Sequence, residues 1–388
     1  MTKNTNNNDC YHGFEQGPIR PPSEAKSLLI RVTRNCPWNH CTFCPVYKET
    51  NFSVRPEAHV IEDIELLHSF ISQFQTMADG SGRILRKDID DQMQRLASHE
   101  QQAFVAALNW YAGGMTSIFL QDANSLVIKP EQLIRILKHL RLRFPWVQRT
   151  TSYARSHTIA RINDDHLKQM HEAGLNRIHI GLESGSDAVL KRVRKGVDKK
   201  TQIKAGQKVK KAGMELSEYV MPGLGGRDLS AEHAVETADA LNRIDPDFIR
   251  LRTLAIPNHI PLAEAYRAGT FKKLNDVEMV RELRMFIDNL EGIQSMVASD
   301  HILNLFEEIK GRLPDAKPHM LAVLDRFLAL TPKEQCRFQV GRRMGVFTRL
   351  EDMESQKRRA RVDAVCAQHG ITAQNVDEAI DEMMKRFI

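Results

Sequence analysis

Three of the six cysteines of the chain, Cys36, Cys41 and Cys44, fall within nine residues, in the stretch RVTRNCPWNHCTFCPVYK. Three thiolates on one short loop can hold three irons of a [4Fe–4S] cluster and leave the fourth iron open to a small-molecule ligand. The other three cysteines lie far apart, whereas a disulfide framework needs an even, spread set. A zinc site would need a fourth ligand nearby, and His40 is the only candidate. The spacing therefore favours a cluster over a zinc site or unrelated thiols.

The composition limits the classes of protein to which the chain can belong. The chain has 388 residues, of which 42% are hydrophobic and 27% charged, as in ordinary globular proteins of two or three domains. We find no apolar run long enough to span a membrane and no apolar stretch near the N-terminus. Unpaired thiols and an oxygen-sensitive cluster fit a reducing cytoplasm. A net charge of +6 permits an anionic substrate or nucleic acid and requires neither.

The elements that must position the cysteines are short β-rich runs, which alternate with amphipathic helical stretches and so predict a parallel α/β sheet. Ligand-binding loops of such sheets follow the carboxyl ends of the strands. The cysteines follow the first run directly, so the sequence predicts a cluster at this edge. The six runs are Ser27–Thr33, Ser117–Gln121, Val147–Ser152, Asn176–Leu182, Glu215–Met221 and Asp247–Leu254.

Two motifs carry a resemblance to a known family. The loop ends in CTFC, with Phe43 directly before the last cysteine, and the fourth run continues as IGLESGSDAVLKRVRKG. Over about residues 27–262 the chain resembles the radical S-adenosylmethionine (SAM) superfamily, whose mark is CxxxCxxC with an aromatic residue at that place. The spacing C-x4-C-x2-C departs from this mark by one residue. The resemblance implies a partial, TIM-like (β/α)6 barrel, one [4Fe–4S] cluster held by the three cysteines, and SAM beside Phe43.

The resemblance also assigns residues around SAM in the first half of the barrel. After the second run, Gln121 and Asp122 stand where the family binds the methionine amino group, and we expect Asp122 to be the ligand because an ammonium ion prefers a carboxylate. A helix N-cap is the alternative for this position. Ser152, at the end of the third run, is expected to point toward the barrel mouth. Arg155 follows in the loop as a candidate for substrate binding, although loop arginines are commonly only solvated.

Further SAM ligands are implied in the second half. Glu183 would meet the ribose or the amino-acid end of SAM, and either Arg194 or Lys195 would pair with the methionine carboxylate. A solvated basic helix is the alternative for these two cations. Glu218 aligns with an acidic position that contacts ribose hydroxyls in oxygen-independent coproporphyrinogen oxidases. The turn MPGLGG that follows would let the backbone approach adenine closely.

The sixth run gives the best sequence indication of the substrate. Arg250 and Arg252 share one face of this strand, and Ile249 and Leu251 share the other. If the apolar pair packs on helices, both arginines face the barrel interior, where an unpaired cation is costly. They could pair with Glu183 or Glu218, hold a carboxylate or phosphate of the substrate, or, in one case, hold the SAM carboxylate.

We divide the chain into a polar extension over residues 1–26 with a frayed start, a barrel over 27–262 and a helical domain over 263–388. The barrel carries an insertion at 57–113 with helices near Val60–Met77 and Asp88–Tyr111. The C-terminal helices are expected at Val277–Leu290, His301–Glu308, Pro318–Leu330 and Asn375–Phe387. Ser299 or Asp300 would cap the second of these, with a substrate role for His301 as the alternative. The basic run at 356–361 is expected on a surface helix.

The resemblance implies a radical SAM enzyme that takes an electron from a flavodoxin or ferredoxin, cleaves SAM reductively and abstracts hydrogen from a substrate. The two arginines of the sixth run lead us to expect that this substrate is an anionic small molecule. Only Cys10 precedes the cysteine motif and only Cys336 and Cys366 follow it, so we expect no second metal centre. A tRNA-modifying radical enzyme and a non-catalytic iron–sulfur or zinc protein remain as alternatives. The first would show salt-dependent RNA binding.

Overall fold

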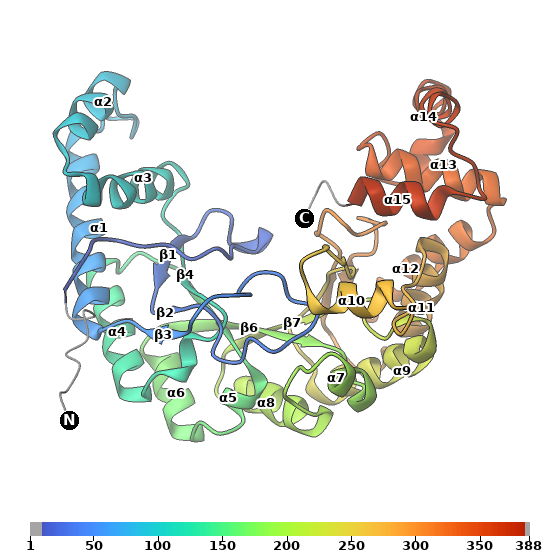
Figure 1. Ribbon diagram of the computed structural model, residues 1–388. Helices are drawn as coiled ribbons and strands as arrows, with labels where there is room; N and C mark the ends of the chain where they lie inside the picture. The colour runs from blue at the N-terminus through green and yellow to red at the C-terminus, as the bar shows by residue number, and fades with distance from the viewer. Residues whose placement is uncertain (1–9, 385–388) are drawn as a thin grey trace. The chain divides into compact units, whose positions relative to one another are not determined.

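The computed structural model describes residues 10–384, and all six predicted strands are present (Figure 1). They are β1 (Leu28–Arg31), β4 (Ser117–Gln121), β5 (Arg149–Ala154), β6 (Leu175–Glu183), β7 (Glu215–Val220) and β8 (Phe248–Leu251). The main sheet has the order β1-β4-β5-β6-β7-β8-β9-β10. The β1–β4, β4–β5 and β7–β8 pairs are parallel, with Leu28 opposite Ile118 and Glu218 opposite Ile249. The predicted α/β fold with a partial barrel is confirmed.

The chain forms two compact units. The first comprises Met1–Pro37, Glu49–His179 and Lys211–Met214, and the second comprises Trp38–Lys48, Ile180–Lys210 and Glu215–Ile388. Thus Cys36 belongs to the first unit, and Cys41 and Cys44 belong to the second. We describe each unit by itself.

The first unit packs its helices around buried apolar side chains. Its elements are η1 (Pro22–Glu24), the antiparallel pair β2 (Thr33–Arg34) and β3 (Ser53–Val54), η2 (Ser125–Val127), and the helices α1 (Glu57–Met77), α2 (Arg86–Arg95), α3 (Ser98–Ala112), α4 (Pro130–Arg143), α5 (Ser156–Ile159) and α6 (Asp164–Glu172). Helix α1 packs on α3 and α4. The rings of Phe70, Phe74 and Phe104 meet edge to face at this contact, with centroids 5.1 to 5.3 Å apart.

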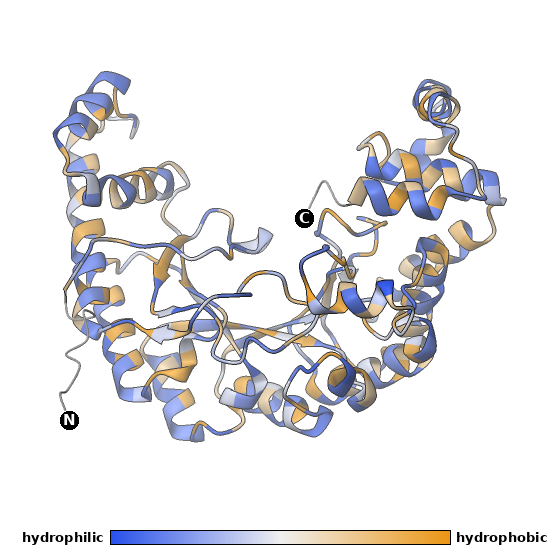
Figure 2. Cartoon of the chain, viewed as in Figure 1, coloured by the Kyte–Doolittle hydropathy of each residue, from blue (hydrophilic) through white to orange (hydrophobic). Residues whose placement is uncertain are grey.

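The second unit contains the helices that begin at or after residue 187. They are α7 (Asp187–Arg192), α8 (Lys199–Lys211), α9 (Gly226–Ile244), α10 (Pro261–Arg267), α11 (Asp276–Asp288), α12 (Lys317–Leu328), α13 (Pro332–Arg343), η3 (Leu350–Glu354), α14 (Gln356–Gln368) and α15 (Val376–Met384). Helix α11 packs on α9 and α12, and α13 packs on α14 and α15. Figure 2 shows hydrophobic residues concentrated on the strands and mixed with hydrophilic residues on the helices.

Three local expectations were wrong. The second insertion helix is divided into α2 and α3 because the chain turns extended at Leu96 and Ala97. The region after residue 262 is not wholly helical, since β9 (Met296–Ala298) and β10 (Gly311–Arg312) add two strands to the sheet. Residues 301–308 form no helix, because the loop after β9 is bonded to the end of β8. The expected fraying falls mainly on residues 1–9, which lie outside the described residues.

No helix among residues 10–384 combines the length and the apolar character that a membrane span requires.

Candidate functional site

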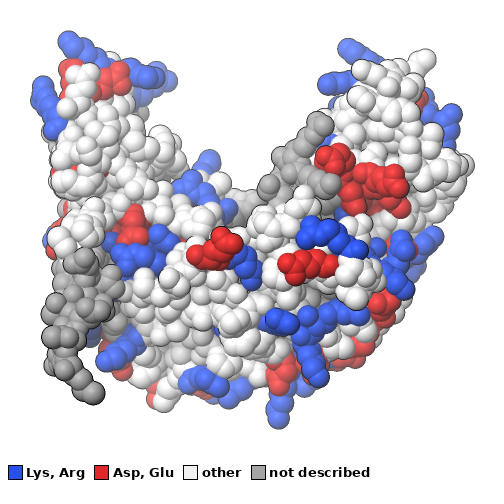
Figure 3. Space-filling view, viewed as in Figure 1, with Lys and Arg blue, Asp and Glu red and all other residues white. Residues whose placement is uncertain are grey.

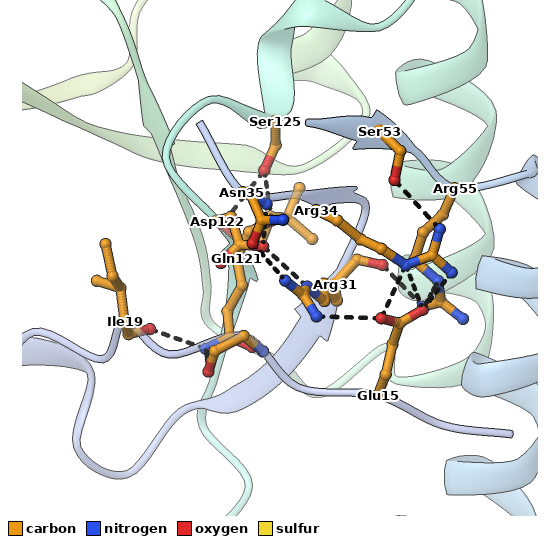
Figure 4. A network of polar contacts seen from close by, with 12 residues as sticks. Glu15, Ile19, Arg31, Arg34, Asn35, Ser53, Arg55, Gln121, Asp122 and Ser125 are labelled. Atoms are coloured by element: carbon orange, nitrogen blue, oxygen red, sulfur yellow. Dashed lines mark hydrogen bonds and ion pairs between the residues drawn. The ribbon is translucent and has the colours of Figure 1, made fainter. Parts of the chain in front are cut away.

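The end of β4 is occupied by the chain's own N-terminal residues. We call residues 11–19 the strap (Figure 4). The Gln121 side chain accepts a bond from the Gly17 N–H (2.8 Å) and donates to the carbonyl oxygens of Gly17 (3.2 Å) and Ile19 (2.8 Å). A Cβ on Gly17 would lie 2.2 Å from Asp122 Oδ1, so the close approach of the strap requires glycine. The Gln121 amide therefore fixes the strap.

Asp122 is fully buried beside Gln121 and is already paired. Its Oδ2 accepts bonds from Arg31 Nε at 2.8 Å and from the Asn35 N–H at 3.0 Å. Arg31 lies opposite Gln121 in the β1–β4 register, which brings its guanidinium to the end of β4. Asp122 makes no helix cap, because η2 has no side-chain cap. Its role toward the SAM amino group stays a prediction.

Glu15 of the strap joins three arginines into one network (Figure 4). Its carboxylate lies 3.1 Å from Arg31 Nη1, 2.6 Å from Arg34 Nη2 and 2.7 Å from Arg55 Nε. Burial raises the pKa of Glu15, but the Arg34 bonds and the charges of Arg55 and Arg31 outweigh burial and hold it below its usual value. Arg55 also pairs with the fully buried Asp63, which accepts a bond from the Tyr11 hydroxyl at 2.8 Å. These carboxylates are thus fully engaged by protein donors.

On the third predicted strand, the side chain of Ser152 does not take the direction that we expected. Ser152 is fully buried opposite Leu120, and its hydroxyl donates to the Tyr153 carbonyl at 3.1 Å. Tyr153 alternates with it and packs edge to face against Phe119 and at a tilt against His179, at centroid distances of 5.4 and 5.3 Å. Ser152 therefore points away from the face that carries these rings. Arg155 is partly exposed, and its N–H is bonded to Asn124 Oδ1 at 3.1 Å.

In the second unit the cysteine loop lies along α7. The Thr42 N–H donates to the Val193 carbonyl at 3.0 Å, and Lys48 Nζ donates to the Cys41 carbonyl at 2.8 Å. Phe43 is buried in a core cluster with Val189 and Val193, against which Cys41 and Cys44 pack. These contacts fix the end of the loop by its backbone and by the packing of Phe43.

All six cysteines are free of disulfides. Between residues 10 and 384, the structure shows no group of three His, Cys, Asp or Glu side chains arranged to hold a metal ion. The assignment of Cys36, Cys41 and Cys44 as cluster ligands therefore stays a prediction from the motif.

Lys195, not Arg194, turns inward at the end of the fourth-strand motif. Its Nζ lies 3.0 Å from Glu183 Oε1 and 5.6 Å from the centroid of the Phe43 ring. Both side chains of the pair are only 13% exposed, whereas Arg194 is exposed. The structure therefore brings Phe43, Glu183 and Lys195 together, three of the residues that the sequence assigned to SAM.

The rest of the ESGS segment serves the fold. The Ser184 hydroxyl bonds His233 Nδ1 at 2.8 Å, and Ser186 caps α7 by accepting from the Val189 N–H at 3.1 Å. A Cβ on Gly185 would lie 2.2 Å from the Glu236 carbonyl oxygen, so only glycine allows this approach to α9. Of the four residues, Glu183 alone points to Lys195.

Glu218 is the most unusual group of the second unit. It is 1% exposed, and neither of its carboxyl oxygens has a hydrogen-bond partner among the described residues. Burial raises its pKa well above the usual 4.5, while the charge of Lys195 lowers it and that of Glu183 raises it. Because buried polar groups are nearly always bonded, two unbonded oxygens beside Lys195 and Glu183 indicate a place for a ligand's donors.

Arg250 has a partner that the sequence did not suggest. Its Nη1 lies 2.7 Å from Asp300 Oδ2, and its Nε donates to the Ser217 hydroxyl at 3.1 Å. The register places Ile249 opposite Glu218, so Arg250 projects from the other face of the sheet. The expected pairing of Arg250 with Glu218 is therefore wrong, and so is the expected capping role of Asp300.

Arg252 is exposed at the end of β8. Its charge, after burial, contributes to lowering the pKa of His301 to about 4, so this imidazole is neutral at pH 7. The Asn304 carboxamide fixes this region by accepting from the Thr253 N–H (2.9 Å) and donating to the Leu251 carbonyl (2.8 Å). Arg252 and His301 thus lie on a braced loop.

Glu15, Tyr153, Asp300 and Asn304 were not identified by sequence reasoning as residues of these clusters. Tyr153 could have been found from the alternation of side chains along TTSYA. The other three offer no such signal, because their partners lie 16 to 53 residues away and the pairing depends on tertiary packing.

The model of the radical SAM superfamily matches residues 30–241, more than half of the chain. The chain belongs to the radical SAM superfamily. It is a radical SAM enzyme by family, and this family uses a [4Fe–4S] cluster and SAM.

Among curated proteins, the chain is similar to the tRNA uridine(34) acetyltransferase of Methanocaldococcus infernus, with 18% identity over 68% of this chain and 49% of the relative. The namesake from Methanocaldococcus jannaschii is 24% identical over 29% of this chain and 21% of the relative. The chain therefore spans half or less of the length of these relatives.

Among solved structures, coproporphyrinogen III oxidase from Escherichia coli is 16% identical, covers 68% of this chain and 52% of its own, and has a TM-score of 0.44. A radical SAM methyltransferase from Kitasatospora setae, solved with cobalamin and a [4Fe–4S] cluster, is 14% identical over 61% of this chain and 36% of its own, with a TM-score of 0.42.

One observation of this structure indicates that the residues present fit the family's cofactors. A SAM molecule carries an ammonium, a carboxylate and ribose hydroxyls. In the second unit, a partly buried cation and two carboxyl groups lie together, and one of these has both oxygens unbonded. This donor and acceptor set matches a polar ligand of that kind.

Proposed function

We propose that the chain uses a single [4Fe–4S] cluster, held by Cys36, Cys41 and Cys44, to cleave SAM reductively and abstract hydrogen from an anionic small molecule. When bound, the cluster supplies the electron that breaks the sulfonium C–S bond of SAM. The observation that carries the proposal is the Lys195–Glu183 pair beside Phe43, with the unbonded Glu218 carboxyl group near it.

Each side chain has a separate task. Lys195 neutralises the methionine carboxylate, because its ammonium group is partly buried and can exchange Glu183 for a ligand oxygen. Glu218 accepts or donates a ribose hydrogen bond in a dry environment, where such a bond is strong. Phe43 excludes water from Lys195 and so strengthens its attraction for a carboxylate.

The exposed cation at the end of β8 supports an anionic substrate. Asp300 neutralises Arg250, which leaves Arg252 as the arginine of this pair that is open to a carboxylate or phosphate. The neutral His301 beside it can donate or accept one hydrogen bond to the same group. Arg155 in the first unit stays a candidate for substrate binding.

The test is anaerobic. Iron and sulfide are reconstituted, SAM and dithionite are added, and 5′-deoxyadenosine is quantified by chromatography. We expect product from the wild-type protein and none from a Cys36→Ala/Cys41→Ala/Cys44→Ala variant. Full cluster loading without 5′-deoxyadenosine would contradict the proposal and favour a non-catalytic iron–sulfur protein.

A tRNA substrate is the second candidate function, and the curated relatives favour it because both are tRNA uridine(34) acetyltransferases by name. Lys357, Arg359 and Arg361 are exposed on α14 and could contact phosphates. This function predicts tRNA binding whose affinity falls steeply between 50 and 200 mM salt. A Lys357→Ala/Arg359→Ala/Arg361→Ala variant would reduce that salt dependence, whereas an anionic small-molecule substrate predicts no effect.

A further inference from the structure

Glu183, the acidic member of the Lys195 pair, ends β6 in a strained turn. Its φ of +63° lies in the left-handed region, which residues with a side chain seldom adopt. The Ser184 N–H donates to the Leu182 carbonyl at 2.8 Å, so the turn closes over three residues with Glu183 at its centre. Three-residue turns with a positive φ are rare and strained. Such strain persists only where neighbouring contacts over-determine the backbone, and it concentrates at ligand sites.

The turn folds the Glu183 carboxylate back over its own strand. A Cβ on Gly181, two residues earlier, would lie 2.3 Å from Glu183 Oε1 and 3.1 Å from Lys195 Nζ. Gly181 belongs to β6 and has no positive φ, so the carboxylate and not the backbone requires glycine there. Charged side chains of both signs lie over the exposed surface (Figure 3), whereas this pair is only 13% exposed. The Glu183 carboxylate therefore has one defined place beside Lys195.

His233 of α9 is bonded to the residues on either side of this turn in space. The imidazole is 2% exposed, with Nδ1 2.8 Å from the Ser184 hydroxyl and Nε2 3.1 Å from the Met221 carbonyl oxygen. Because a carbonyl oxygen only accepts, we assign the proton of the neutral ring to Nε2, so Nδ1 accepts from Ser184. The Met221 N–H donates to the Glu183 carbonyl at 3.0 Å. One imidazole thus ties the strained peptide to the end of β7.

Glu282 of α11 holds the end of β7 in turn. Its carboxylate is 3% exposed and accepts from the Gly223 N–H and the Ser230 hydroxyl, at 2.6 Å each. It also lies 3.7 Å from His233 Nε2. Gly223 is two residues beyond Met221, so the segment that accepts from His233 is itself fixed by helix α11.

We propose that His233 is a positioning residue of the SAM site, whose two bonds maintain the strained turn and so direct the Glu183 carboxylate, over Gly181, to Lys195. The inference rests on the proposed function, in which Glu183 and Lys195 contact SAM. His233 acts through Glu183, because its ring is buried and both of its nitrogens bond protein groups. Without these bonds, Glu183 relaxes to an ordinary negative φ, and its carboxylate turns away from Lys195.

The test measures the Kd of SAM by equilibrium dialysis on the anaerobically reconstituted protein, together with thermal unfolding. We expect His233→Ala to raise the Kd about tenfold, because a misplaced Glu183 no longer completes the site. His233→Gln should bind within about twofold of wild type, since a carboxamide can accept from Ser184 and donate to Met221 at once.

Ser295→Ala is the matched control. It removes another fully buried hydrogen bond of the second unit, from the Ser295 hydroxyl to the Pro246 carbonyl, before the start of β8. This variant should lower the unfolding temperature and leave the Kd of SAM unchanged. Stability loss by itself is thereby separated from loss of position.

Gly181→Ala displaces the same carboxylate without any change in α9. Its added methyl group takes the place of Glu183 Oε1, so we expect a rise in Kd of about tenfold here also. In a Glu183→Ala background, both Gly181→Ala and His233→Ala should change the Kd less than about twofold, because the group through which they act is absent.

The other outcomes overturn the inference. An unchanged Kd in His233→Ala, or a rise that persists in the Glu183→Ala background, makes His233 a structural residue only and leaves the proposed function intact. If His233→Ala does not fold, Ser184→Ala decides, since it removes the Nδ1 bond without emptying the site of the ring: a raised Kd supports the inference and an unchanged Kd overturns it. A wild-type protein that loads a cluster and binds no SAM is a failure of the proposed function itself.

Discussion

The two charged clusters of this enzyme differ in how completely their carboxyl groups are bonded. In the first unit, Glu15, Asp63 and Asp122 are each engaged by arginines, and the network contains as many cations as anions. In the second unit, Lys195 forms an ion pair with Glu183, whereas both Glu218 oxygens lack a hydrogen bond among the described residues. A completed network holds the fold, and an incomplete one leaves donors and acceptors for a ligand. Substitutions in each network should therefore have different effects.

The largest effect is expected from Arg55→Ala in the completed network. Removing a guanidinium that is 1% exposed leaves Asp63 buried and without its ion pair. We expect the free energy of unfolding to fall by about 3–5 kcal/mol, measured by urea denaturation. Arg86→Ala is the control, since its pair with Asp90 is exposed and should contribute less than about 1 kcal/mol. A loss below about 1 kcal/mol for Arg55→Ala would show that the network does not stabilise the unit.

Lys195→Met tests the incomplete cluster. We expect the rate of 5′-deoxyadenosine formation with dithionite to fall about 100-fold, because a partly buried charge pair with the ligand carboxylate is lost. Cluster content and thermal stability, recorded alongside, separate this effect from misfolding. Arg194→Ala is the matched variant and should retain most of the rate, since its side chain is exposed. The reverse pattern would exchange the roles of the two cations.

Glu218→Gln tests the raised pKa in the cofactor-free protein. The pKa of Glu218 is higher in the folded chain than in the unfolded chain. The ionisation of Glu218 therefore has no effect on stability at a pH where both the folded and the unfolded chain carry the protonated group. As the pH rises above 4.5, the unfolded chain loses this proton more readily, and the folded state is destabilised. The variant should therefore gain stability relative to wild type as pH increases, by at most about 1.4 kcal/mol per pH unit. A constant difference in unfolding free energy from pH 4 to 8 would show that Glu218 is not perturbed.

Glu15→Gln should give the smallest effect, because the carboxylate is 26% exposed and its arginines keep other partners. We expect a loss of about 1 kcal/mol in unfolding free energy. Amide hydrogen exchange should quicken at residues 11–19 and remain unchanged on β4. If exchange in the strap does not change, the Gln121 bonds alone hold it.

The sequence was sufficient for the parts of the fold that depend on periodic patterns and motifs. All six parallel strands were predicted because short β-rich runs alternate with helical stretches, and the inward cation was narrowed to Arg194 or Lys195 by the motif. The sequence could not distinguish the two cations, because the difference depends on the backbone. Arg194 has a left-handed φ of +54°, which turns the chain there. The Arg250–Asp300 pair was missed because β9 has only three residues and follows an irregular loop. The strap was missed because its partners lie 16 to 104 residues away along the chain, so its pairing depends on tertiary packing.

The strap also sets an order for folding. Gly17 is bonded to Gln121 across a separation of 104 residues, and Ile19 across 102. On the ribosome, Tyr11 and Glu15 meet their partners within 16 to 52 further residues, whereas Gly17 and Ile19 have no Gln121 side chain to bond until more than a hundred further residues have been synthesised. At about 5–20 residues per second, that interval lasts about 5–20 seconds. The Gly17 and Ile19 end of the strap therefore reaches its native place only after β4 has been synthesised.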